Sequence, residues 1–271
     1  VMFTLLIQTA VGIFGISFFN IWINTGTVVQ IPFIILSTCL GLILLGLISA
    51  SAHLKNPKNA PHAIMNFTRS WLSREIVVIH LFALCIGLVL ILRGMNFKQG
   101  LFVFEIMAVI FGILTIFTMG RVYRLKAVPV WDSFATPLDF WGTTLLTGGV
   151  ASAVLNWLVS AKAYEPWLIF VLFSGLGLGF KVVAGVSTLR VKKRSKYRFQ
   201  YASQRTKIDG QILITILQAV LYTLGLSLFA AAFMVMTNQA SFFLPISFAV
   251  IGLTEIWSRF CFYDSFCRLG L

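Results

Sequence analysis

The chain has 271 residues, of which 59% are hydrophobic and 11% charged, and its formal net charge at pH 7 is +13. A typical soluble domain carries about 25% charged residues, so this composition excludes an ordinary soluble protein. The apolar runs are continuous and about as long as a bilayer is thick, whereas a transmembrane β-barrel needs alternating apolar and polar residues. We therefore predict an all-α, polytopic integral membrane protein with a single transmembrane domain over residues 1–271.

Length and hydropathy predict an eight-helix transmembrane bundle. The spans are expected near residues 2–23, 30–54, 75–93, 100–122, 137–160, 166–188, 211–236 and 241–262. The chain begins at Val1 rather than at Met, so we expect a short leading segment before it, and the first run is too long for a cleavable signal peptide. Glycines inside the spans, such as Gly148 and Gly149, are interpreted as sites where helices approach closely.

The connections after the second, fourth and sixth spans are long and basic, whereas the others are short. With an even number of spans, both termini lie on the same membrane face as these long connections, and we name it the loop face. It includes the basic run from Arg190 to Arg198. The positive-inside rule predicts that the loop face is cytoplasmic. Basic loops also bind acidic partner subunits or anionic lipid head groups, and this alternative stays open.

Two ionisable residues at the loop face are the first candidates for chemistry, because a charge at or inside a span is costly. His53 ends the second span and Glu75 begins the third, so both side chains are expected at the same depth. Histidine titrates near neutral pH and a desolvated carboxyl group approaches that range, so the pair suits the removal of protons from a quinol. The spacing equally allows that His53 caps its helix and that Glu75 pairs with Arg69 or Arg74.

Three other features carry polar or aromatic groups. His80 is interpreted as a second proton carrier, a haem ligand or, most commonly in proteins, a core histidine bonded to a backbone carbonyl. Tyr123 and Trp131, around an extended loop, are either interface anchors or walls of a pocket for an aromatic head group. Glu255 and Arg259 stand at i and i+4, which predicts an intrahelical ion pair.

No metal site is predicted in this chain. Cys39 and Cys85 lie mid-span and are interpreted as packing residues, and the spacing from Cys261 to Cys267 matches neither a zinc nor an iron–sulfur site. The sequence has no phosphate-binding glycine-rich loop, no Cys-x2-Cys and no nucleophile elbow. If the protein takes part in redox chemistry, a partner must therefore hold the metal centres. The single acids Glu105 and Asp139 suggest no role.

Five motifs, in order along most of the chain, together resemble the membrane anchor subunit of the dimethyl sulfoxide reductase family, within the wider group of NrfD-like quinol-oxidising anchors. They are Ala52-His53-Leu54-x-x-Pro57, Ser70-Trp-Leu-Ser-Arg-Glu75-Ile, Arg121-Val-Tyr, Val128-Pro-x-Trp131-x-Ser133-x-x-Thr136-Pro137, and Glu255-x-x-x-Arg259-x-x-Phe262-Tyr263.

The resemblance implies an eight-helix anchor without haem that oxidises menaquinol. Electrons would pass to an iron–sulfur subunit with four clusters and then to a molybdopterin-containing catalytic subunit. It implies that His53 and Glu75 act on the quinol. Relatives often carry an arginine shortly after Pro57, and here Lys58 or His62 would replace it. The full set of quinol-binding candidates is His53, Lys58, His62, Trp71, Arg74, Glu75, Arg121, Tyr123 and Trp131.

The predicted function is therefore the quinol-oxidising anchor of a molybdopterin oxidoreductase complex in anaerobic respiration, in the cytoplasmic (inner) membrane of a bacterium or archaeon. The resemblance implies that the loop face is periplasmic, whereas the positive-inside rule predicts that it is cytoplasmic. We keep both orientations. One alternative function is a proton- or ion-translocating subunit, which is disfavoured because the acids lie near the ends of spans. Another is a passive anchor without a quinone site.

Overall fold

The computed structural model describes residues 1–25, 31–52, 66–97, 100–159, 167–193, 205–234 and 240–265. In these ranges each of eight helices is long and apolar enough to cross a membrane, which confirms the predicted all-α polytopic fold. The largest shift from a predicted boundary is at α9, which begins at Arg205 rather than near 211. The helices are α1 (Met2–Thr25), α2 (Phe33–Ser51), α4 (Trp71–Gly94), α5 (Leu101–Val122), α6 (Ala135–Val159), α7 (Trp167–Lys193), α9 (Arg205–Met234) and α10 (Ala240–Asp264).

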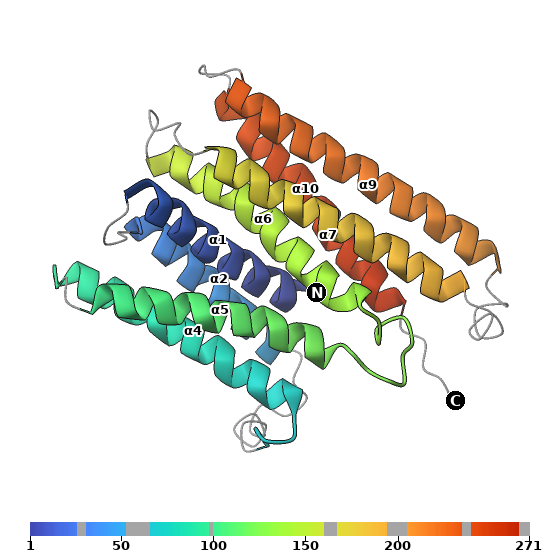
Figure 1. Cartoon of the computed structure of the whole chain (residues 1–271), viewed down its shortest axis with the longest axis horizontal. Coiled ribbons are helices and arrows are strands. Elements are labelled where there is room, and N and C mark those ends of the chain that lie inside the picture. Colours follow the sequence, from blue (N-terminus) through green and yellow to red (C-terminus); the bar gives the residue numbers. More distant parts are fainter. Residues whose placement is uncertain are drawn as a thin grey trace.

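Helices that follow one another in the chain pack together as pairs: α1 with α2, α4 with α5, α6 with α7, and α9 with α10 (Figure 1). The helix α1 also packs against α6, and this contact joins the group α1, α2, α4 and α5 to the group α6, α7, α9 and α10. The starts of α1, α4 and α6 and the end of α10 lie at the same end of the bundle (Figure 1). This is the arrangement that the loop-face prediction requires.

Two pairs of glycines allow α6 to lie close to its neighbours. A Cβ atom added to Gly12 in α1 would lie 2.8 Å from the Cα atom of Gly148 in α6, and a Cβ atom added to Gly177 in α7 would lie 2.8 Å from the carbonyl oxygen of Gly142. In lipid the hydrophobic effect does not drive helices together, so association depends on close van der Waals packing. The interpretation of Gly148 as a packing site is confirmed.

Apolar side chains fill the interior and also cover the outside, as expected for helices whose outer faces meet lipid. Phe14 and Phe82 pack edge to face between α1 and α4, with ring centroids 5.9 Å apart. Cys39 and Cys85 are buried free thiols in the same core, as predicted. Large apolar side chains remain exposed on the helices, among them Leu45, Leu84, Ile110, Leu172, Leu213 and Leu253.

Candidate functional site

The predicted acid of the site, Glu75, is buried at the loop-face end of α4. The side chain of Ser70 caps this helix by accepting a hydrogen bond from the backbone N–H of Ser73 at 3.3 Å, so α4 begins at Trp71. Glu75 therefore lies in the second turn, where it is 2% exposed. Its Oε1 atom is buried and has no hydrogen-bond partner within the described ranges. Because an unpaired buried carboxylate oxygen is costly, this group is suited to hold a proton or to accept a hydrogen bond from a ligand.

Beside Glu75, the ring of Trp71 lies against two guanidinium groups. The guanidinium carbon of Arg74 is 4.3 Å from the ring centroid and that of Arg121, at the end of α5, is 4.9 Å away. Arg74 also donates hydrogen bonds to the backbone carbonyls of Phe67 at 3.0 Å and Thr68 at 2.6 Å. The cation–π contact of Arg121 joins the start of α4 to the end of α5, whereas the hydrogen bonds of Arg74 fix the start of α4 to the chain before it. Together they place aromatic and cationic groups at the loop face.

The alternative in which Glu75 pairs with Arg69 or Arg74 is wrong. Among the described residues, Glu75 takes part in none of the ion pairs. The reason is geometric. Arg74 turns back toward the chain before α4 and binds backbone carbonyls there, while the side chain of Glu75 is buried inside the bundle.

Tyr123 connects this region to the last helix. It follows α5, and its hydroxyl accepts a hydrogen bond from the hydroxyl of Tyr263 at 2.9 Å. Burial raises the pKa of Tyr123 above its ordinary value, and Tyr263 and the nearby Glu75 carboxyl group raise it further. The phenol of Tyr123 therefore stays neutral and keeps its proton.

Trp131 belongs to the same aromatic group. Its ring stacks on Phe262 with centroids 5.1 Å apart and meets Tyr123 edge to face at 5.9 Å. The indole N–H lies 3.1 Å from the carbonyl oxygen of Phe262, to which it donates. Trp131 is buried, with 7% of its surface exposed. This burial does not fit an interface anchor, and Trp131 packs instead in a small aromatic core with Tyr123, Phe262 and Tyr263.

The structure brings several predicted site residues together. Trp71, Arg74 and Arg121 are in contact, and Glu75 lies near enough to Tyr123 to influence its titration. Three predicted residues, His53, Lys58 and His62, lie outside the described residues.

His80 is hydrogen-bonded to a backbone carbonyl, as expected for a structural histidine rather than for a proton carrier or a haem ligand. The distance from its Nδ1 atom to the carbonyl oxygen of Ile76 is 2.7 Å, but its side chain is exposed on α4 rather than placed in a core. Over the part of the chain that the structure describes, no three His, Cys, Asp or Glu side chains gather closely enough to hold a metal ion.

A second polar group, which the sequence analysis missed, lies between α6, α7 and α10. The Nζ atom of Lys181 is 2.8 Å from Oδ1 of Asp139 and 3.1 Å from Oε2 of Glu255. The Nη1 atom of Arg259 is 3.2 Å from Oδ2 of Asp139. We name these four residues the charge cluster. Lys181 could have been found from the sequence, because it is a single lysine inside a long apolar run, where a charge requires a partner.

The predicted pair between Glu255 and Arg259 is wrong. Each residue forms its ion pair with another helix, Glu255 with Lys181 and Arg259 with Asp139. Arg259 also donates to Gln8 of α1 at 3.0 Å and to Thr143 of α6 at 2.9 Å. An i, i+4 pair is favoured on the surface of an isolated helix, but here both side chains are buried and meet opposite charges on α6 and α7.

A known protein family matches nearly the whole sequence. The family model described as DMSO reductase anchor subunit (DmsC) matches residues 1–265. The chain belongs to this family. The family resemblance predicted from the motifs is thereby confirmed, and the protein is a multi-pass membrane protein of the anchor-subunit type.

A curated relative is the C subunit of the anaerobic dimethyl sulfoxide reductase of Haemophilus influenzae (strain ATCC 51907 / DSM 11121 / KW20 / Rd), 29% identical over 163 residues. The match covers 57% of this chain and 57% of the relative, so the chain spans a little over half the length of the relative it matches. No solved structure matches significantly.

Proposed function

We propose that this chain anchors a dimethyl sulfoxide reductase-type complex in the cytoplasmic (inner) membrane of a bacterium or archaeon and oxidises menaquinol at the loop face. Membership of the anchor-subunit family supports the anchor role. In this proposal an iron–sulfur subunit with four clusters takes the electrons and passes them to a molybdopterin-containing catalytic subunit. The metal centres then belong to the partners, and the anchor provides the quinol site.

The observation that carries the quinol site is the buried, unpaired carboxylate oxygen of Glu75. A quinol gives up two protons together with two electrons, so its site needs a group that accepts a proton and can pass it to water. Glu75 suits this role because it is buried in the second turn of α4, close to the loop face. A carboxyl group placed within hydrogen-bond reach of a quinol hydroxyl acts as a general base.

The neighbours of Glu75 suit the rest of a quinol head group. Trp71, with its two guanidinium contacts, offers a flat aromatic wall. The neutral phenol of Tyr123 keeps its proton near the Glu75 carboxyl group. His53, Lys58 and His62 precede α4 in the sequence, and we propose His53 as the second proton acceptor.

The test is Glu75→Gln in the assembled complex, with Glu105→Gln as the matched control. Glu105 is also buried and has an unpaired Oε2 atom, but it lies near the start of α5, at the opposite membrane face. Because a general base contributes about 10²–10⁴-fold to a rate, Glu75→Gln is expected to lower menaquinol-linked turnover by about 10²-fold or more. Turnover with an artificial dye that reduces the partner subunits directly is expected to stay unchanged. His53→Ala is expected to behave like Glu75→Gln.

The proposed site is refuted if both Glu75→Gln and His53→Ala keep normal menaquinol-linked turnover and normal affinity for a quinol analogue. An equal loss in Glu105→Gln would point to a general effect of burying a neutral amide. If turnover with the artificial dye also fell, the cause would be poor assembly with the partner subunits rather than loss of quinol oxidation.

The charge cluster is the one observation that favours ion translocation as a second candidate. Glu255 lies nine residues before the end of α10 at Asp264, about 13 Å into the helix at 1.5 Å per residue. Glu255 therefore lies deeper than the span ends, where the acids were expected. However, the cluster contains two acids and two bases that neutralise each other. The helices α6 and α10, which hold both acids, are also continuous rather than broken at the midplane. We therefore prefer the function of a quinol-oxidising anchor to that of an ion-translocating subunit.

A further inference from the structure

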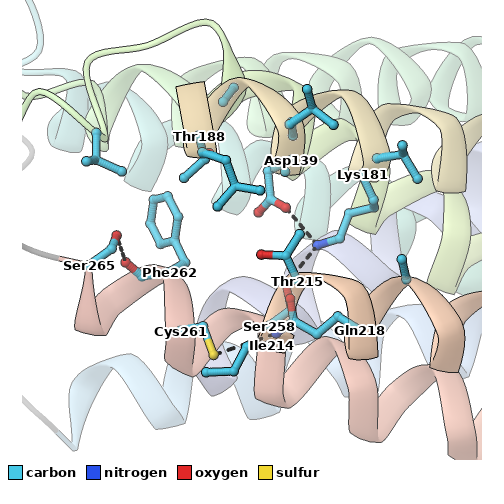
Figure 2. Close-up of a pocket in the computed structure, with 18 of the residues that line it drawn as sticks. Asp139, Lys181, Thr188, Ile214, Thr215, Gln218, Ser258, Cys261, Phe262 and Ser265 are labelled. Carbon is cyan, nitrogen blue, oxygen red and sulfur yellow. Dashed lines mark hydrogen bonds and ion pairs between the residues drawn. The ribbon is translucent and has the colours of Figure 1, made fainter. Parts of the chain in front are cut away.

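A cleft is lined by residues of α6, α7, α9 and α10 (Figure 2). Glu75 lies on α4, in the other group of helices. The volume of the cleft is about 370 Å³. Along α7 its lining extends from Lys192 near the loop face to Lys181, a distance of about 16 Å for eleven residues of helix. The cleft therefore reaches from the membrane surface well into the apolar part of the bundle.

The side of the cleft opens toward lipid. Three apolar side chains at its rim are largely exposed: Val182 at 47%, Val186 at 42% and Ile216 at 55%. These residues lie on α7 and α9, which face each other across the cleft. A molecule dissolved in the bilayer can therefore enter sideways between α7 and α9 without first passing through water.

The inner end of the cleft is polar and has no net charge. Lys181 and Asp139 line it together with Gln218, Tyr222 and Ser258 (Figure 2 labels all of these except Tyr222). The whole charge cluster holds two acidic and two basic side chains, so an ionic head group would gain no net attraction there. Hydrogen-bond donors and acceptors are both present, which suits a neutral molecule that carries oxygen atoms.

We propose that this cleft is a second binding site for a neutral, lipid-soluble molecule of the quinone class, separate from the site at Glu75. The ring oxygens would bind at the inner end, and the apolar tail would leave through the opening between α7 and α9. A phospholipid fits less well, because its phosphate would stay at the loop face and its acyl chains would face the polar groups of the inner end. The choice of a quinone over other neutral lipids rests on the proposed function.

The site can be blocked without touching its charges. Gly185 lines the cleft, and a Cβ atom added there would lie 3.4 Å from Cγ2 of Thr215 across the cleft. Gly185→Leu therefore places a side chain where the ligand would lie. Gly179→Leu is the matched control, because Gly179 is exposed on the same helix and a Cβ atom there would meet nothing within 4 Å.

The experiment uses the purified complex that contains this chain and a photoreactive azido-naphthoquinone with a short isoprenoid tail. We expect labelled peptides from the cleft-lining segments 181–192, 214–222 and 258–265. A leucine side chain at position 185 would occupy space that the ligand needs. Gly185→Leu is therefore expected to lower this label about tenfold. Gly179→Leu and Glu75→Gln are expected to leave it unchanged. Excess unlabelled naphthoquinone should remove the label, and excess phosphatidylglycerol should not.

Each contrary outcome overturns the inference. The inference is overturned if these segments of the wild-type chain carry no label, a result that does not depend on whether Gly185→Leu assembles. It is also overturned if wild type and Gly185→Leu are labelled equally, or if phosphatidylglycerol removes the label. Label found only near residues 71–75 and 121–131 would overturn the second site and leave the proposed quinol site standing. Label in the cleft, together with normal menaquinol-linked turnover and normal quinol-analogue affinity in both Glu75→Gln and His53→Ala, would instead refute the proposed quinol site and support this second one.

Discussion

Removal of Lys181 is the sharpest test of how the second half of the bundle is held together. In Lys181→Met, the side chain keeps its length and loses its charge. Asp139 keeps an ion pair with Arg259 at 3.2 Å, but Glu255 loses the ion pair that it forms with Lys181 at 3.1 Å. One carboxylate is then left buried without a counter-charge.

The expected cost follows from two independent estimates. Removing one partner of a buried ion pair destabilises a protein by about 3–5 kcal/mol. A lone acid at the centre of a membrane-spanning helix costs about 2.5–3.5 kcal/mol on insertion scales. We therefore expect Lys181→Met to lower the free energy of unfolding by about 3 kcal/mol. Lys181→Met combined with Glu255→Gln removes both charges, and we expect it to recover about 2 kcal/mol of that loss, since the buried carboxylate is gone.

The measurement is a double-mutant cycle on the free energy of unfolding, obtained by titrating the purified protein with dodecyl sulfate in mixed micelles. The four proteins are wild type, Lys181→Met, Glu255→Gln and the double variant. Gly179→Leu, on the lipid-facing side of α7, controls for non-specific effects. The reasoning fails if Lys181→Met is as stable as that control, or if the double variant is less stable than Lys181→Met.

Two other predictions concern packing and titration. Gly12→Val is expected to lower the free energy of unfolding by about 1–3 kcal/mol, because its side chain would overlap α6. Gly15→Val is the control, because a Cβ atom at Gly15 would meet nothing within 4 Å. We expect it to leave the free energy of unfolding unchanged in the dodecyl sulfate titration. Because burial raises the pKa of Tyr123, the unfolded chain loses this proton near pH 10 while the folded chain retains it, so stability should fall as the pH rises above about 10. Tyr123→Phe should reduce that fall, and an unchanged pH profile of unfolding would contradict the assignment.

The spans were predictable because a bilayer imposes its thickness on the sequence. All eight helices were expected, and most boundaries lie within a few residues of the predicted ones. The helix α9 differs most because its first turns, Arg205 to Gly210, are polar and lie outside the apolar run that hydropathy detects. A helix can continue into water after its apolar stretch ends, and hydropathy does not report that part.

The candidate site was predictable only in part. Glu75, Trp71, Arg74 and Arg121 were proposed as site residues from the sequence, and their role stays a prediction. The structure places Arg74 and Arg121 against the ring of Trp71. The partners of the charged groups were not predictable. Glu255 was expected to pair within its own helix and instead pairs with Lys181, 74 positions away in the sequence.

The amino-acid sequence by itself determined that this protein is a polytopic helical membrane protein of the anchor-subunit family, because length, hydropathy and ordered motifs are local properties of the chain. Only the tertiary structure decided which buried charges meet. The ion pairs of Asp139, Lys181, Glu255 and Arg259 join three helices, and the contact of α1 with α6 depends on two glycines 136 positions apart. Such contacts depend on how the helices rotate and tilt against one another. Inside a membrane that is set by close packing and, in the charge cluster, by the pairing of buried charges.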